Sequence, residues 1–277
     1  MSVTIHTGDC LKILPGLPRS SVDCCVTSPP YWGCLDYGAS AQLGNEETRD
    51  GYIARMVEVF RQVRETLKDE GTLWLNLGDS YNAYNGGSGP GGFFKYQRRS
   101  RFLQKKATGH GLTDKGLKPK DLLGMPWRVA LALQGDDWYL RSEIIWEKPS
   151  ATWEAGAKDR PSRNHEHVFL LSKNRRYYFG DLGARRPRTV WHLEGGERCK
   201  DHPADFPPAL PRTCIILGCP EGGTVLDPFL GSGTTAMVAD RLQREAIGIE
   251  VNPEYAKIAR RRVVNDGPLF ADVRTRE

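Results

Sequence analysis

Two short stretches hold residues whose types and spacing could do chemistry. The first runs from Asp227 to Thr235 (Asp-Pro-Phe-Leu-Gly-Ser-Gly-Thr-Thr), and Glu250 follows at the end of the next apolar run. Glycines behind a strand let the backbone approach a ligand closely. Asp227 at the strand tip suits a cationic group, and Glu250 can accept hydrogen bonds from ribose hydroxyls. S-adenosylmethionine carries both an amine and a ribose, so it fits two carboxylates placed in this way.

The second stretch is Thr27-Ser-Pro-Pro-Tyr-Trp-Gly33, which follows an apolar run. Its two prolines stiffen the loop and remove two backbone donors, so the loop offers acceptors, namely the Ser28 hydroxyl and the Pro29 carbonyl. Tyr31 adds a flat face for stacking. Two acceptors beside an aromatic ring suit the exocyclic amine of a nucleobase. Accepting both amine hydrogens would free the nitrogen lone pair for in-line attack on a sulfonium methyl.

These stretches need a scaffold that brings strand ends together. Strand and helix patterns alternate along the chain, which predicts an α/β, Rossmann-like fold with a mostly parallel sheet and helices on both faces. Predicted strands are Val3–His6, Val22–Thr27, Thr72–Leu77, Leu140–Trp146, His167–Leu171, Thr224–Asp227 and Ala246–Glu250. Predicted helices are Asp9–Leu14, one from Tyr52 to near Gly71, Asp121–Leu133, Pro208–Leu217, Ala236–Leu242 and Glu254–Val264. The whole chain, 1–277, is expected to be a single catalytic domain.

Two irregular basic segments interrupt this pattern. Residues 82–119 form a predicted glycine-rich inserted loop, and residues 172–200 a second irregular stretch. Residues 95–120 carry nine lysines and arginines against one acid, although the net charge of the chain is only +5. An otherwise acidic body with two basic segments predicts a polyanionic partner held at one face.

Composition excludes several classes of protein. The chain has 277 residues, of which 39% are hydrophobic and 26% charged, so it is long enough for a sizeable core and is not a disordered tail. Its longest apolar run, Val129–Leu133, is far shorter than a membrane span. We expect no signal peptide and no membrane partner. Seven cysteines indicate reduced thiols, and their irregular spacing with histidine predicts no metal site.

The two motifs together resemble those of the amino-group DNA methyltransferases. Ser-Pro-Pro-Tyr near the N-terminus and Asp-Pro-Phe-x-Gly-Ser-Gly-Thr-Thr near the C-terminus are similar to the circularly permuted β class. Gly8-Asp9-Cys10, His202–Pro207 and Gly248–Asn252 match further family segments that contact the adenine, the methionine and the ribose of the cofactor. The resemblance assigns catalysis to Ser28, Pro29, Pro30 and Tyr31. It assigns S-adenosyl-L-methionine binding to Asp9, Cys10, Thr27, Phe206, Asp227, Phe229, Gly231, Ser232, Gly233, Thr234, Thr235, Glu250 and Asn252.

The same resemblance implies a double-stranded DNA substrate with the target base flipped out. Ser-Pro-Pro-Tyr is typical of cytosine-N4 enzymes and Asp-Pro-Pro-Tyr of adenine-N6 enzymes, so Ser28 favours N4-methylcytosine, with adenine-N6 as the alternative. Predicted DNA-binding residues are Lys95, Arg98, Arg99, Arg101, Lys105, Lys106, Arg185, Arg186 and Arg188. A bacterial or phage-encoded cytoplasmic enzyme is implied. Monomer and homodimer both stay open, as does a cognate restriction endonuclease.

Other functions fit the residues less well. An oxidoreductase that uses a nicotinamide cofactor would need a third glycine in the turn that starts at Gly231. Cytosine-C5 methylation needs a cysteine after proline, and the chain contains no Pro-Cys dipeptide. An enzyme with the same cofactor could instead act on RNA or on a protein amide, but the basic insert argues against a protein substrate. A DNA-binding module without catalysis would leave Ser28 and Tyr31 idle.

Overall fold

Nine strands form one sheet in the computed structural model, which describes residues 1–35, 37–39, 41–82, 114–148, 158–183, 187–193, 206–267 and 272–276. The sheet order is β6-β4-β5-β3-β2-β7-β8-β1-β9. The strands are β1 (Ser2–Thr7), β2 (Val22–Thr27), β3 (Leu67–Leu77), β4 (Tyr139–Glu147), β5 (His165–Ser172), β6 (Val190–His192), β7 (Thr224–Asp227), β8 (Glu245–Glu250) and β9 (Asp272–Arg276). Every neighbouring pair is parallel except β3–β5 and β4–β5, because β5 alone runs the other way.

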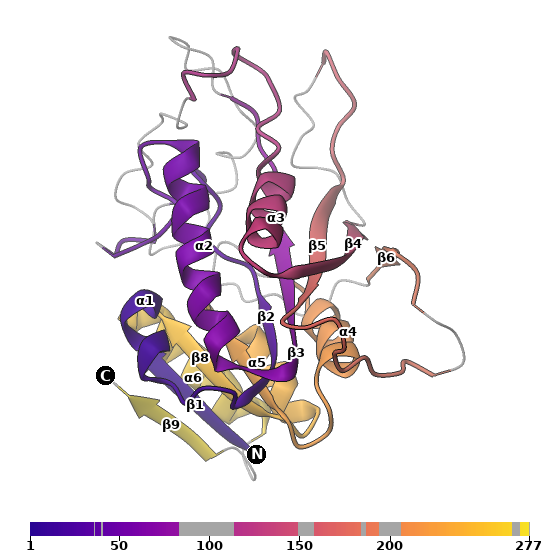
Figure 1. The fold of residues 1–277 in the computed structure, drawn as a ribbon. Helices are drawn as coiled ribbons and strands as arrows, with labels where there is room; N and C mark the ends of the chain where they lie inside the picture. Colours follow the sequence, from indigo (N-terminus) through magenta and orange to yellow (C-terminus); the bar gives the residue numbers. More distant parts are fainter. Residues whose placement is uncertain are drawn as a thin grey trace.

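Helices cover both faces of this sheet (Figure 1). On one face lie α1 (Cys10–Ile13), α2 (Arg49–Thr66) and α3 (Met125–Gly135), and on the other α4 (Ala209–Gly218), α5 (Thr234–Arg241) and α6 (Pro253–Asp266). The central strands β2, β3, β5, β7 and β8 divide their buried residues between the two cores: Cys25 of β2 packs under α2, and Cys24 and Val26 pack under α4. The predicted α/β fold with a mostly parallel sheet is therefore confirmed.

The long helix α2 illustrates how the sequence specifies these elements. Thr48 caps it by accepting a hydrogen bond from the Gly51 amide, 3.0 Å away. Tyr52, Met56 and Val63 recur at helical spacing and are at most 1% exposed. Each such side chain contributes about 1.5–3 kcal/mol through burial. The helix is thus fixed against the sheet, and the Tyr52 hydroxyl reaches the loop after β2.

Several predicted boundaries were wrong. Helix α2 ends at Thr66 instead of near Gly71, because Leu67–Gly71 is extended and belongs to β3. Helix α3 begins at Met125 instead of Asp121, since Gly124 precedes it in a left-handed conformation at φ 67°. Helix α5 begins at Thr234 instead of Ala236, so the turn before it is two residues shorter than the predicted Gly231–Thr235. The edge strands β6 and β9 were not predicted, and β6 lies within the stretch that was expected to be irregular.

The topology brings the chemically interesting residues to one edge of the sheet. The parallel strands β1, β2, β7 and β8 end there, at Thr7, Thr27, Asp227 and Glu250. The antiparallel β5 starts there, at His165. This carboxyl edge is where ligands bind in open α/β sheets. In the described part of the chain, no helix is long and apolar enough to cross a membrane.

Candidate active site

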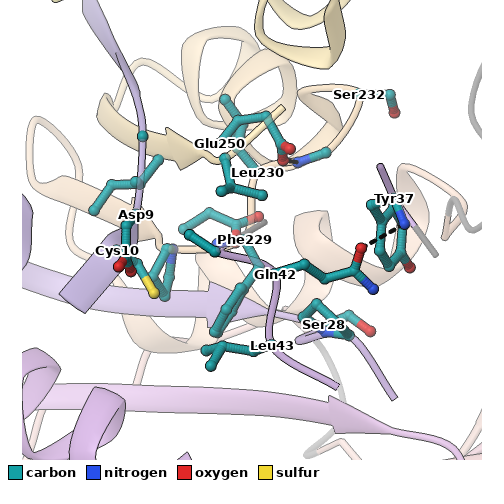
Figure 2. Close-up of a pocket in the computed structure, with 18 of the residues that line it drawn as sticks. Asp9, Cys10, Ser28, Tyr37, Gln42, Leu43, Phe229, Leu230, Ser232 and Glu250 are labelled. Atoms are coloured by element: carbon teal, nitrogen blue, oxygen red, sulfur yellow. Dashed lines mark hydrogen bonds between the residues drawn. The ribbon is translucent and has the colours of Figure 1, made fainter. Parts of the chain in front are cut away.

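A cavity of about 760 Å³, open solvent included, lies at this carboxyl edge. Figure 2 shows Asp9 and Cys10 on one side of it, Ser28 and Tyr37 on the other, and Phe229 and Glu250 between them. Predicted cofactor-binding residues that line it are Asp9, Cys10, Phe206, Asp227, Phe229, Gly231, Ser232, Thr234 and Glu250. Of the predicted catalytic residues, Ser28 and Pro30 line it. The two sequence stretches, about 200 residues apart, therefore face one cavity.

Asp227 is a buried acid at the end of β7. One of its carboxylate oxygens accepts hydrogen bonds from the Thr27 hydroxyl at 2.6 Å and from the Phe229 amide at 3.0 Å. Burial raises its pKa to about 6, and the hydroxyls of Thr27 and Thr235 and the Phe229 amide oppose that rise. A buried carboxylate held this way favours a cationic ligand. Thr27 and Thr235 do not line the cavity; they support Asp227.

Glu250 ends β8 on the same side. Its two carboxylate oxygens accept one backbone amide each, from Gly231 and from Asn252, both at 2.8 Å. Burial raises the pKa of Glu250 to about 7, against the effect of these two amides. Each oxygen keeps a second lone pair, so the carboxylate can also accept hydrogen bonds from ligand hydroxyls.

The glycine turn between β7 and α5 is fixed by helix α6. Gly231 and Gly233 have φ values of 54° and 86°, in the left-handed region. A Cβ on Gly233 would lie 2.8 Å from the Cβ of Ala259 on α6. The guanidinium of Arg262 donates to the Ser232 carbonyl and hydroxyl at 2.8 and 2.6 Å. This turn is therefore preorganised as a floor for the cavity.

Replacing Gly233 with alanine is expected to lower the free energy of unfolding by about 2 kcal/mol, because the left-handed backbone and the contact with Ala259 both become unfavourable. Urea denaturation measures this loss. Gly135→Ala is the matched control, since nothing lies within 4 Å of a Cβ there. Equal stability of the two variants would contradict the fixed turn.

The loop after β2 that carries the predicted catalytic residues Ser28–Tyr31 is held in place by its own contacts. The Tyr52 hydroxyl donates to the Pro30 carbonyl at 2.9 Å. Pro29 is buried and does not line the cavity. A Cβ on Gly78 would lie 2.7 Å from the Tyr31 ring, so Gly78 allows that ring to pack against the end of β3. The loop is rigid, which suits a part that must position a reacting group.

A buried polar network surrounds Tyr31, and the sequence analysis missed most of it. Tyr31 donates from its hydroxyl to Glu166 of β5 at 2.9 Å, and Ser28 donates to Tyr31 at 3.3 Å. The side-chain amide of Asn76 donates to Glu166 at 2.8 Å, and Lys148 forms an ion pair with the same carboxylate. Glu166 shares a strand face with Val168 and Leu170, and an acid in an apolar period-two pattern is the signal that could have revealed it.

A second missed feature is the segment between the Ser28–Tyr31 loop and α2. Tyr37, Gln42 and Leu43 line the cavity. The Tyr37 amide donates to the side-chain oxygen of Gln42 at 2.5 Å, a contact drawn in Figure 2. Asn252, predicted to bind the cofactor, instead donates from its side chain to the Tyr37 carbonyl at 2.7 Å and caps α6. No sequence motif marks this segment.

Most predicted DNA-binding residues lie outside the described residues: Lys95, Arg98, Arg99, Arg101, Lys105, Lys106, Arg185 and Arg186. Arg188 is described and exposed, and its carbonyl accepts a hydrogen bond from the Trp191 indole at 2.8 Å. Within the described ranges, no group of three or more histidine, cysteine or acidic side chains is arranged to hold a metal ion.

This architecture is the fold of the S-adenosylmethionine-dependent methyltransferases. TTHA0409 from Thermus thermophilus, a putative DNA modification methylase solved in complex with S-adenosyl-L-methionine, superposes with a TM-score of 0.69 at 25% identity, covering 99% of this chain and 98% of that one. The PvuII DNA methyltransferase, described as cytosine-N4-specific, has the same fold, with a TM-score of 0.71 at 20% identity over 99% of this chain and 95% of its own.

Sequence comparisons define the family. The DNA methylase family model (N6/N4 methyltransferases) matches residues 22–261. Type II methyltransferase M.SmaI of Serratia marcescens is 46% identical over 95% of this chain and 91% of its own length. Type II methyltransferase M.Cfr9I of Citrobacter freundii is 43% identical over 92% of this chain and 86% of its own length. The chain belongs to the DNA methylase family and is an amino-methyltransferase, which confirms the resemblance of its two motifs.

Proposed function

We propose that this enzyme transfers the methyl group of S-adenosylmethionine to the exocyclic N4 of cytosine in double-stranded DNA. The observation that carries the proposal is that Ser28 of the Ser-Pro-Pro-Tyr loop lines the same cavity as Asp227 and Glu250. Serine at the first position of this loop is typical of the cytosine-N4 members of the family, which supports cytosine. The alternative target is N6 of adenine, which the same pair of acceptors would serve.

The carboxylates that line the cavity fit the polar groups of the cofactor. Glu250 accepts from the ribose hydroxyls, and Asp227 stabilises the cationic end of the methionine part. Asp9, whose side chain also accepts from the Leu11 amide at 3.0 Å, faces the adenine with Cys10. The glycine turn lets the backbone come close. When bound, the cofactor supplies a methyl group made electrophilic by a sulfonium.

The catalytic loop orients the target amine. The Ser28 hydroxyl, which lines the cavity, accepts one of its hydrogens, and the Pro29 carbonyl, which does not line the cavity in this conformation, is the predicted acceptor of the other. Accepting both hydrogens would free the nitrogen lone pair for attack on the methyl group. The Pro30 carbonyl accepts from the Tyr52 hydroxyl, and this contact holds the loop in place. Tyr31 contributes an aromatic face next to the base. Because the loop is fixed before the base arrives, little ordering remains to be done in the transition state.

DNA binding involves the basic segments. Residues 82–119 and 172–200, with the lysines and arginines predicted above, hold the phosphates around a flipped base. Chain 1–277 acts as a single catalytic domain in the cytoplasm of a bacterium or its phage. The type II names of its relatives favour a cognate restriction endonuclease.

Methylated nucleosides test the proposal directly. The protein is incubated with methyl-labelled cofactor and unmethylated duplex DNA of mixed sequence, and the digested nucleosides are identified by mass. We expect labelled N4-methylcytosine. N6-methyladenine would instead support the alternative base, and cofactor binding without either product would overturn the DNA substrate. Reactions with the Ser28→Ala variant control for a contaminating methylase.

A further inference from the structure

The hydroxyl of Ser28 belongs to a chain of hydrogen bonds that begins at a buried ion pair. Glu166 is 6% exposed and is paired with Lys148, whose ammonium also lies 4.8 Å from the centroid of the Trp146 ring. Tyr31 donates to Glu166, and Ser28 donates to Tyr31. The side-chain amide of Asn76, 2% exposed, shares its two hydrogens among Glu166, the Tyr31 oxygen at 2.9 Å and the Ser28 oxygen at 3.3 Å. All these groups are at the carboxyl edge beside the cavity.

The direction of these hydrogen bonds is fixed at the Glu166 end. Lys148, Asn76 and Tyr31 hold the pKa of Glu166 below its usual value despite burial, which acts the other way, so this side chain is a carboxylate and only accepts. Tyr31 has a single hydroxyl hydrogen and gives it to Glu166. The Tyr31 oxygen can therefore only accept from Ser28. The 3.3 Å between the two hydroxyls is long, as catalytic hydrogen bonds often are before the substrate binds.

This direction decides what Ser28 can offer the cavity. Its one hydrogen is directed at Tyr31, and one lone pair faces the Asn76 amide. The remaining lone pair is left for the cavity that Ser28 lines. An exocyclic amine presents hydrogens, so it needs an acceptor at this point. With the opposite direction, the Ser28 hydrogen would meet the amine hydrogens and repel them.

We infer that Glu166 is a positioning residue that acts through Tyr31 to make the Ser28 hydroxyl an acceptor for the target amine. The inference rests on the proposed function but holds for either base, because cytosine and adenine both present an exocyclic amine. It assigns Tyr31 a second role besides any stacking of its ring: because its hydroxyl donates to Glu166, it accepts the hydrogen of Ser28.

The test replaces Glu166 with glutamine, which has nearly the same shape but can donate to Tyr31 and so reverse the chain. We expect kcat for DNA methylation to fall at least tenfold, with the Kd for S-adenosylmethionine unchanged within about twofold. Glu143→Gln is the matched control: Glu143 on the neighbouring β4 accepts from His167, away from Tyr31, and its loss is expected to leave kcat unchanged.

Tyr31→Phe separates positioning from a merely structural ion pair. This variant breaks the chain but leaves Glu166 with Lys148 and Asn76, so it is also the test if Glu166→Gln does not fold. We expect at least a tenfold loss of kcat at unchanged cofactor affinity. Combining the two substitutions should add less than twofold, because both interrupt one chain. Wild-type kcat in Tyr31→Phe, or fully multiplicative losses in the double variant, would overturn the inference. An inactive wild-type chain would overturn the proposed function as well.

Discussion

Replacing Ser28 with alanine is expected to lower kcat about a hundredfold while the Kd for S-adenosylmethionine stays within about twofold of the wild type. The size follows from losing one preorganised hydrogen-bond partner of the reacting group. The selectivity follows from position: Ser28 directly follows β2, whereas Asp9 comes just after β1, and Asp227 and Glu250 end β7 and β8. The hydroxyl therefore acts on the amine and contributes little to holding the cofactor.

Single-turnover methylation and calorimetric cofactor titration measure the two quantities separately. Ser21→Ala is the matched control, because Ser21 precedes β2 at its other end and its hydroxyl donates to the Pro18 carbonyl at 2.7 Å. It should leave both quantities unchanged. If Ser28→Ala weakened cofactor binding as much as it lowered kcat, the hydroxyl would be part of the cofactor site and its assigned role would be wrong.

The second large effect concerns Glu250 and pH. Glu250→Gln is expected to weaken S-adenosylmethionine binding ten- to a hundredfold at pH 8, as hydrogen bonds to a charged acceptor contribute about 1.5–3 kcal/mol. Because burial raises the pKa of Glu250 to about 7, the wild type loses its charged acceptor as the pH falls. Wild-type affinity should therefore decline between pH 8 and pH 5 and approach that of the variant.

Stability of the cofactor-free protein should change in the opposite direction. The pKa of Glu250 is higher in the folded state than its ordinary value of 4.5, so the folded state binds more protons between these values. The contribution of Glu250 to stability is thus present in full below pH 4.5 and is lost as the pH rises through 7. The Glu250→Gln variant does not have this loss. The Tm of the variant minus the Tm of the wild type should therefore increase from pH 5 to pH 8. A Tm difference that is constant with pH would contradict the raised pKa.

The sequence predicted those parts of the site that are local in the chain. Asp227, the glycine turn and Glu250 belong to one β-α-β unit, whose strand and helix periods are each visible over a few residues. The stiff loop at Ser28 is likewise marked by adjacent prolines. Once both are placed at strand ends, a parallel sheet must bring them to one edge.

Groups that depend on distant pairing were not predictable in this way. Glu166 meets Tyr31 only because β5 runs antiparallel to β3, with Asn76 opposite Val168. Nothing local fixes the direction of a strand. Asn252 looked like a ligand from its place after Glu250, but its side chain holds the Tyr37 carbonyl, more than 200 residues earlier in the chain. The edge strand β9 is short and mostly exposed, so it lacks the apolar pattern by which strands are recognised.

The place of β1 in the sheet has a consequence for how the protein is made. β1 is translated before the other strands of the sheet but pairs with β8 and β9, with Val3 opposite Ala246 and Val273. Within the described sheet, the nascent β1 therefore has no native neighbour until β8 has left the ribosome. Contacts this remote in sequence form slowly, and the strand edge stays open to aggregation or chaperone binding meanwhile. Asp9 and Glu250, the residues proposed to hold the methyl donor, come together only at this step, so we expect methyl-donor binding to begin only after synthesis has passed β8.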